Sequence, residues 1–162
     1  FTSVELSNGK RKDNLGSETQ NRYIARAFNN FNITKNSSIY LNLESYLLKS
    51  NNYYANEMLL FGGINSIRGF EENSISANKL LLINSEYKLK LNNDIYINTI
   101  LDTANYENLV DNIKANIYGF GFGLNINTKS GIFRINYANG IKKGQEIDLK
   151  LSKIHLSFSN VF

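Results

Sequence analysis

The chain has 162 residues and a formal net charge of +4, with 18 Lys and Arg against 14 Asp and Glu. This length suits one domain, and a hydrophobic content of 42% is too high for a disordered chain. Cysteine is absent, which excludes a disulfide framework, thiolate-bound zinc and a cysteine nucleophile, and the single histidine, His155, excludes a multi-histidine metal site. No apolar run approaches the ~20 residues of a membrane-spanning helix. No signal peptide is visible, so we expect Phe1 to begin a mature or trimmed chain.

Apolar residues alternate with small or polar residues along most of the chain, which is the period of a β-strand and not of a helix. The alternation is weak in residues 1–8 and 18–33. It is clear in six later segments: Ile39–Leu47, Leu81–Leu91, Ile95–Asp102, Tyr118–Asn127, Phe133–Ala138 and Ile154–Phe162. The sequence therefore predicts eight strands.

The connections between these strands alternate between long and short. In chain order they are residues 9–17, 34–37, 51–76, 92–93, 105–116, 128–131 and 142–147. An even number of strands joined in this way is typical of an outer-membrane β-barrel. We therefore predict an all-β fold, an eight-stranded antiparallel transmembrane β-barrel in which residues 1–162 form a single domain, located in the bacterial outer membrane. A soluble lipocalin-like barrel or a β-sandwich also alternates, but its exposed face is usually richer in charge.

The longest connection, residues 51–76, is far beyond the usual loop length, which indicates a functional or a disordered segment. Its centre reads Phe61-Gly-Gly-Ile-Asn-Ser-Ile-Arg-Gly-Phe70. The pair Gly62-Gly63 followed by Ile67-Arg68-Gly69-Phe70 resembles the motif of the Omp85 superfamily of outer-membrane insertases and translocases (bacterial surface antigen type). This resemblance implies that the loop folds back into the barrel.

Four further segments resemble the same superfamily in the expected order: Ser85–Lys88, Leu101–Asn105, the hairpin Gly119–Arg134 and the C-terminal stretch Ile154–Phe162. Within the last of these, Leu156, Phe158 and Phe162 match the C-terminal assembly signal. Ala104 and Ser159 stand where the family usually has glycine, and both are small enough to preserve strand packing.

The resemblance covers less than a typical family member. Omp85 proteins usually carry periplasmic POTRA domains and a sixteen-stranded barrel, whereas this chain resembles only the C-terminal eight strands, in a minimal form without POTRA domains. Either a compact member of the family or a piece of a larger chain fits this pattern.

Strand parity places Glu86 and Asp102 on the lumenal faces of adjacent strands, where an inward-folded loop would bring Arg68 between them. A guanidinium group suits two carboxylates, and Gly69 would let the loop tip turn or approach the wall closely. The resemblance implies the same contact. The alternative is that Arg68 lies on a solvated loop and that other cations pair with the two carboxylates: Lys88, Lys90 or Arg134.

The resemblance implies membrane-embedded assembly work, the insertion or transport of proteins or lipids. From the residues themselves we expect no catalysis, no cofactor and no metal. Residues 1–162 carry no nucleophile elbow and no acid–base spacing, and we expect His155 to be a lumenal hydrogen-bonding residue. A second hypothesis is a non-catalytic structural or surface-binding barrel that keeps the loop for stability.

The predicted size bears on both hypotheses. The lumen of a closed eight-stranded barrel is just filled by its own side chains, so a closed monomer would not conduct. Open strand edges are not tolerated in a membrane. Two copies would therefore pair first strand to last strand in a sixteen-stranded barrel, or two closed barrels would associate as a dimer. The expected partners are outer-membrane lipids, a second copy and client membrane proteins, and no nucleic acid.

Overall fold

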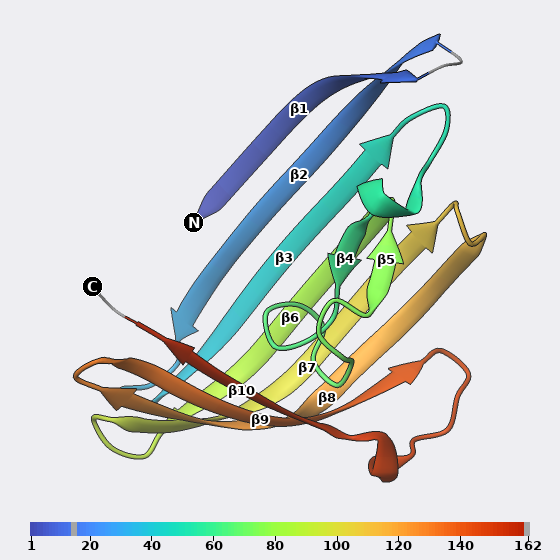
Figure 1. The fold of residues 1–162 in the computed structure, drawn as a ribbon. Helices are drawn as coiled ribbons and strands as arrows, with labels where there is room; N and C mark the ends of the chain where they lie inside the picture. Colours follow the sequence, from blue (N-terminus) through green and yellow to red (C-terminus); the bar gives the residue numbers. More distant parts are fainter. Residues whose placement is uncertain (14–15, 161–162) are drawn as a thin grey trace.

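The structure, a computed structural model, describes residues 1–13 and 16–160 as an all-β chain (Figure 1). Its elements are the strands β1 (Thr2–Asp13), β2 (Gly16–Asn32), β3 (Ser37–Lys49), β4 (Leu59–Phe61), β5 (Ile75–Ala77), β6 (Lys79–Lys90), β7 (Ile95–Asn108), β8 (Ile113–Thr128), β9 (Gly131–Lys142) and β10 (Lys153–Ser159), and the 3-10 turns η1 (Ala55–Glu57) and η2 (Leu149–Leu151). Among these residues no helix is long and apolar enough to cross a membrane.

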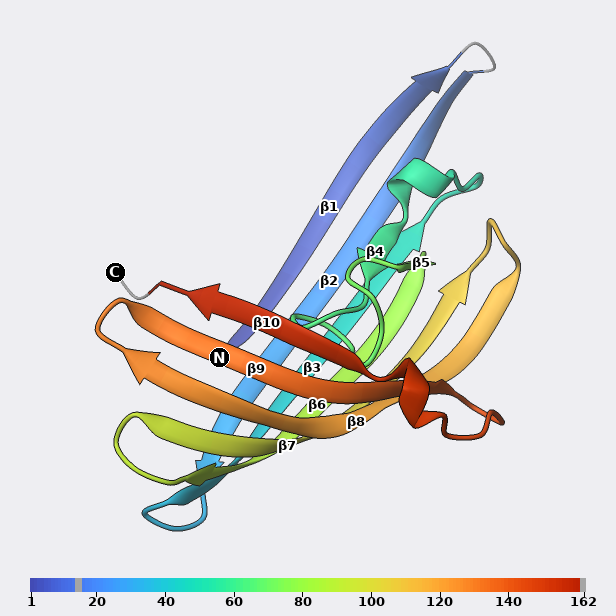
Figure 2. The same cartoon turned by 60° about the horizontal axis from the view of Figure 1, so that its bottom comes forward.

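Eight strands form one antiparallel sheet in the order β1-β2-β3-β6-β7-β8-β9-β10, which confirms the all-β fold and the predicted number of strands. The other two, β4 and β5, pair with each other inside the long connection. In the described part of the chain β1 pairs only with β2, and β10 only with β9. The structure is therefore an open, curved sheet and does not show the closed barrel that the sequence predicted (Figure 2).

The strands extend further than the alternation of side chains indicates. β1 and β2 continue through the predicted loop 9–17 and remain paired up to Asp13 and Gly16. In the same way, β7 and β8 shorten the predicted loop 105–116 to residues 109–112. These extensions carry polar side chains, but ladder hydrogen bonds join backbone groups and form whatever the side chains are.

The two faces of the sheet differ in chemistry. The convex face carries large apolar side chains that are exposed on every strand of the sheet except β9, among them Val4, Leu6, Tyr23, Ile39, Leu41, Leu43, Leu81, Ile83, Leu101, Phe122, Ile154, Leu156 and Phe158. A water-soluble sheet hides such a face, so this arrangement indicates an apolar environment or a partner surface.

The concave face holds the core. The long connection, residues 50–78, lies over this face in both views (Figure 1, Figure 2). At the end of the sheet with the long connection an apolar cluster joins the sheet to the connection: Tyr46, Leu48, Phe61, Ile67, Ala77, Leu80, Leu82, Ala104, Tyr106 and Ile117. Toward the short turns the buried residues of the concave face include four asparagines: Asn84, Asn98, Asn125 and Asn136. The motif residues lie where these two halves meet.

Candidate functional site

Residues 62–74 join β4 to β5 and form what we call the motif loop. Gly62 and Gly63 open it with φ angles of +114° and +93°, a region that side-chain-bearing residues rarely adopt. A Cβ on Gly62 would lie 2.5 Å from the backbone oxygen of Glu71, because the two arms of the loop run close together. The Gly63 N–H then donates to the Ile67 carbonyl at 3.1 Å, which closes the turn.

Ile67 anchors the motif loop to the sheet. Its side chain is 0% exposed and belongs to the apolar cluster on the concave face. Full burial of an aliphatic side chain stabilises by about 1.5–3 kcal/mol. This burial fixes the position of the next residue, Arg68, over the centre of the sheet.

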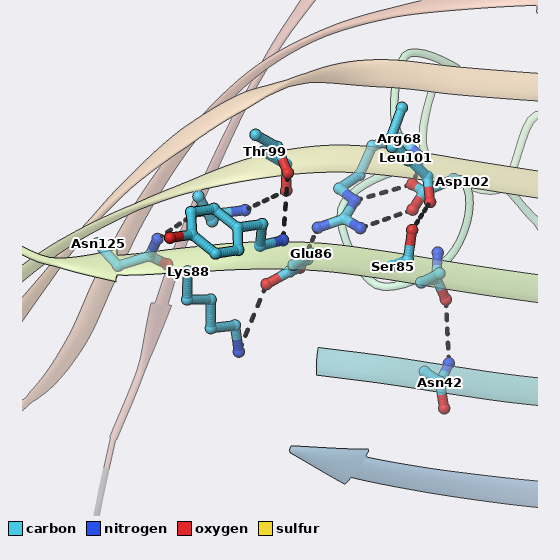
Figure 3. Close-up of polar contacts among 12 residues, drawn as sticks. Asn42, Arg68, Ser85, Glu86, Lys88, Thr99, Leu101, Asp102 and Asn125 are labelled. Carbon is cyan, nitrogen blue, oxygen red and sulfur yellow. Dashed lines mark hydrogen bonds and ion pairs between the residues drawn. The ribbon is translucent and has the colours of Figure 1, made fainter. Parts of the chain in front are cut away.

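Arg68 lies between two carboxylates from adjacent strands, Asp102 of β7 and Glu86 of β6 (Figure 3). Its Nη2 donates to Asp102 Oδ1 at 2.6 Å, and its Nε donates to Oδ2 at 2.8 Å, which gives a bidentate fork. The Arg68 backbone N–H donates to the same Oδ2 at 2.9 Å, and Nη1 donates to Glu86 Oε1. The Asp102 side chain is 0% exposed, so its charge depends on Arg68 for compensation.

Glu86 lies at a break in the pairing of β6 with β7. The ladder runs as far as the pair Ser85 and Leu101 and resumes in the same register at Lys88 and Asn98, after a gap of two residues on each strand. Inside the break the Tyr87 N–H donates to Thr99 Oγ1 at 3.1 Å, and the Ser85 hydroxyl donates to the Leu101 carbonyl at 2.9 Å (Figure 3). The hydroxyl groups of Ser85 and Thr99 thus form hydrogen bonds with backbone groups of β6 and β7 on either side of Glu86.

Three glycines let the motif loop lie directly on the sheet backbone. Gly119 of β8 and Gly140 of β9 are cross-strand partners. A Cβ on Gly119 would lie 2.2 Å from the Arg68 carbonyl oxygen, and one on Gly140 would lie 2.6 Å from a ring carbon of Phe70. Gly69 itself has a φ of +90°, and a Cβ there would lie 2.4 Å from the Gly140 nitrogen. A side chain at any of these positions would push the loop away.

The motif loop also contacts β10, the last strand of the sheet. The Gly69 N–H donates to His155 Nε2 at 3.1 Å, so this nitrogen is the unprotonated one. Lys153 Nζ donates to Glu71 Oε1 at 2.8 Å, and this hydrogen bond together with the lysine charge lowers the pKa of Glu71. The loop therefore joins the centre of the sheet to its C-terminal edge.

The remaining predicted residues lie elsewhere. Leu156 and Phe158 are exposed on the convex face of β10, away from the motif loop, and Phe162 lies outside the described residues. Lys88 also contributes to the centre, since its Nζ lies 3.4 Å from Glu86 Oε2. Within residues 1–13 and 16–160 neither Lys90 nor Arg134 pairs with a carboxylate.

The structure adds residues that the sequence did not single out as part of the site. Gly119 and Gly140 form the floor under the loop tip, and Thr99 and Ser85 support the break beside Glu86. The one visible indication was the alternation of glycine on the inward face of residues 118–127. Alternating glycine shows that space is needed, but it does not say what fills it.

The arrangement holds the motif loop in place on the sheet. Both carboxylates are engaged by Arg68, and the described residues contain no group of three or more His, Asp or Glu side chains that could hold a metal ion. In comparisons with known proteins, no protein-family model matches the chain and no curated protein is significantly similar to it.

Proposed function

We propose that this chain forms part of the wall of an outer-membrane β-barrel and that it takes part in the insertion or transport of membrane proteins or lipids. The observation that carries the proposal is the motif loop, fixed on the concave face by Arg68 between Asp102 and Glu86. The residues that make this contact are those through which the sequence resembles the Omp85 superfamily, whose members do such work.

The exposed apolar face of the sheet supports the membrane setting. Aliphatic and aromatic side chains cover the convex face, and the opposite face carries charged and amide groups. A membrane barrel places these two kinds of face toward lipid and lumen respectively. Outer-membrane lipids are accordingly the first partner we propose, and a bacterial outer membrane is the proposed location.

Closure of the barrel requires a partner for β1 and β10. Unpaired backbone N–H and C=O groups at these edges would each cost several kcal/mol in hydrocarbon. We propose that a second copy supplies the pairing, so that two sheets close one sixteen-stranded barrel. Closure of a single chain into an eight-stranded barrel is the alternative, and its filled lumen would favour a structural or surface-binding role.

The contacts of the motif loop suggest how it serves such a barrel. The loop tip touches β8 and β9 through glycine and touches β10 through His155 and Lys153. In the proposed barrel β10 borders the join between the two sheets. A loop anchored at Arg68 would hold this strand in position while its neighbour across the join is exchanged or displaced by a client.

The experiment is a client-folding assay in vesicles of phosphatidylethanolamine and phosphatidylglycerol. The purified chain is reconstituted, an unfolded outer-membrane barrel protein is added, and its folding is followed by protease protection. We expect the wild-type chain to speed client folding and Arg68→Ala to lose most of this effect. Leu48→Ala serves as the matched control, because it removes a buried side chain of the apolar cluster but leaves Arg68, Asp102 and Glu86 in place.

The outcomes separate the two functions. Loss of client folding in Arg68→Ala but not in an equally destabilised Leu48→Ala supports assembly work. If the wild-type chain leaves client folding unchanged, or if both variants lose the same activity in proportion to stability, the chain is a structural barrel. The second reading has its own support in the structure, since the ion pair and the apolar cluster together fill much of the concave face.

A further inference from the structure

A polar cavity lies on the concave face beyond Arg68, toward the short turns. Its volume is about 240 Å³, room for roughly eight water molecules at about 30 Å³ each. Charged, phenolic and amide groups line it: Arg134, Lys88, Tyr40, Tyr96, Asn125 and Asn136. The size and the polarity suit a small hydrophilic solute and not an acyl chain.

Arg134 is the unusual member of this lining. Its Nε is buried and has no hydrogen-bond partner, and no carboxylate of the described residues lies within 4.0 Å of its guanidinium group. The Nε of Arg11 is also buried without a partner, but the guanidinium group of Arg11, like those of Arg26 and Arg68, pairs with one or two carboxylates. A partly buried guanidinium without a counter-ion is costly, and its donors are arranged to receive the two oxygens of an oxyanion.

The charged groups around the cavity also favour an anion as its ligand. Lys88 lies above the Tyr40 ring, with Nζ 4.3 Å from the ring centre, and shares Glu86 with Arg68. A second cavity of about 260 Å³ adjoins at the short-turn end, since Lys88 and Tyr96 line both. Three of its lining residues are lysines and none is acidic. Glu86 is the one acidic residue that lines the first cavity, where it faces Arg68, Lys88 and Arg134, so cations outnumber carboxylates in both linings. An excess of positive charge raises the local concentration of anions.

Amide groups complete the lining. Asn125 Nδ2 donates to Asn98 Oδ1 at 2.7 Å (Figure 3). Gly123 makes room for these amides, because a Cβ there would lie 2.2 Å from Asn136 Oδ1 and 2.5 Å from Asn98 Oδ1. Primary amides can donate to an anion as well as to each other.

We propose that this cavity is a binding site for a small oxyanion, a phosphate or carboxylate group, held by the Arg134 guanidinium with Lys88 as the second cation. The oxyanion belongs to a free solute or to the headgroup of a lipid, and the chemistry of recognition is the same. The cavity borders the Arg68 ion pair, since Arg68 and Glu86 also line it, but anion binding by Arg134 does not require the assembly function proposed above.

The test is calorimetric titration of the full chain, in an uncharged detergent at low ionic strength, with inorganic phosphate. We expect Arg134→Gln to weaken phosphate binding at least about tenfold, the scale of one charge-assisted hydrogen bond. Arg134→Lys keeps the charge but loses the forked guanidinium group, so its affinity for phosphate should lie between those of the wild type and Arg134→Gln. Arg26→Gln is the matched control, because Arg26 is an ion-paired arginine of the same sheet that does not line the cavity.

The outcomes decide the proposal and the source of the anion. Competition by phosphatidylglycerol in the micelle would identify a lipid headgroup, and phosphate binding without such competition would identify a free solute. The proposal is overturned if wild-type protein binds no phosphate, or if Arg26→Gln weakens binding as much as a folded Arg134→Gln. Because no client protein is present, a failed client-folding assay leaves this result unaffected.

Discussion

At the scale of single residues, Arg68 has the largest predicted effect. Removing it would leave the buried Asp102 carboxylate without its counter-ion, and we expect Arg68→Ala to lower the free energy of unfolding by about 3–5 kcal/mol. Urea unfolding in detergent, followed by circular dichroism, measures this. Arg26→Ala, which breaks a partly exposed pair with Glu44, should cost about 0–1 kcal/mol. Equal losses in the two variants would contradict a central role for the buried pair.

The glycine floor under the loop tip gives a second prediction. Gly119→Ala would place a methyl group 2.2 Å from the Arg68 carbonyl oxygen, so the motif loop must shift. We expect a loss of about 1–3 kcal/mol, as for an overpacked core, and faster proteolysis within residues 62–74. Gly9→Ala is the control, because nothing lies within 4 Å of the Cβ it would add. Unchanged proteolysis in Gly119→Ala would show that the loop does not rest on this floor.

The sequence predicts some of these residues and misses others for a physical reason. Alternation fixes which side chains share a face, so Glu86 and Asp102 can be placed together on adjacent strands from their positions alone. The contact of Arg68 with Gly119 and Gly140 depends on how the motif loop crosses three strands, and no periodicity within one strand encodes that path. Position on a strand does not choose among the cations on that face either, and Arg134, one of the alternative partners, lies within 4.0 Å of neither carboxylate.

At the scale of elements, one hydroxyl group accepts the backbone N–H that the break between β6 and β7 leaves without a ladder partner. Thr99→Val keeps the shape of the side chain but removes the acceptor for the Tyr87 N–H. An unsatisfied backbone donor costs about 1–3 kcal/mol, and we expect this loss in urea unfolding together with faster amide exchange at Tyr87. Thr103→Val on the same strand is the control, because Thr103 pairs with Ile83 in the regular ladder. Identical behaviour of both variants would mean that the hydroxyl is not needed there.

The ion pair of Glu71 with Lys153, which joins the motif loop to β10, should weaken in acid. Lys153 lowers the pKa of Glu71 in the folded chain, so this pair stabilises the fold fully above the pKa of an unfolded glutamate. Its contribution is lost as the pH falls through the lowered pKa of Glu71. We expect the protection factors of the amides in residues 69–74, which remove the intrinsic pH dependence of exchange, to fall over this acidic range. Glu71→Gln should abolish this fall, and a fall that persists in this variant would assign it to another group.

The strands show where sequence patterns stop being informative. Alternation predicts eight strands because the convex face must be apolar wherever it meets lipid or a partner. Beyond the apolar part of the convex face the strands need not alternate. The paired ends of β1 and β2 near Lys10 and Gln20 are therefore polar on both faces, and their sequence resembles that of a loop. The short hairpin of β4 and β5 escapes prediction for a different reason, since three-residue strands are too short to show a period.

At the scale of the whole molecule, the open edges determine what the sheet can form. Seven antiparallel steps separate β1 from β10, so the two edge strands run in opposite directions. β1 of one copy can therefore pair antiparallel with β10 of another while both convex faces stay on the outside. A twofold axis then makes two identical joins and leaves no free edge.

The absence of cysteine makes this arrangement directly measurable. Leu6 of β1 and Leu156 of β10 both point outward, and two differently tagged copies would carry Leu6→Cys and Leu156→Cys respectively. A disulfide forms only when the Cα atoms come within about 4.4–6.8 Å, so we expect cross-linked dimers for this pair or for its neighbours on β10, Ile154→Cys and Phe158→Cys, according to register. Tyr23→Cys on the interior strand β2 should not cross-link. A chain that carries both Leu6→Cys and Leu156→Cys tests the alternative. If a disulfide forms only within this single chain and never between two copies, then β1 and β10 of one copy close an eight-stranded barrel. Native mass spectrometry of the unmodified chain in detergent would then show a monomer. A monomeric eight-stranded barrel has no lumen wide enough to accept a client, so this result would contradict the proposed assembly function.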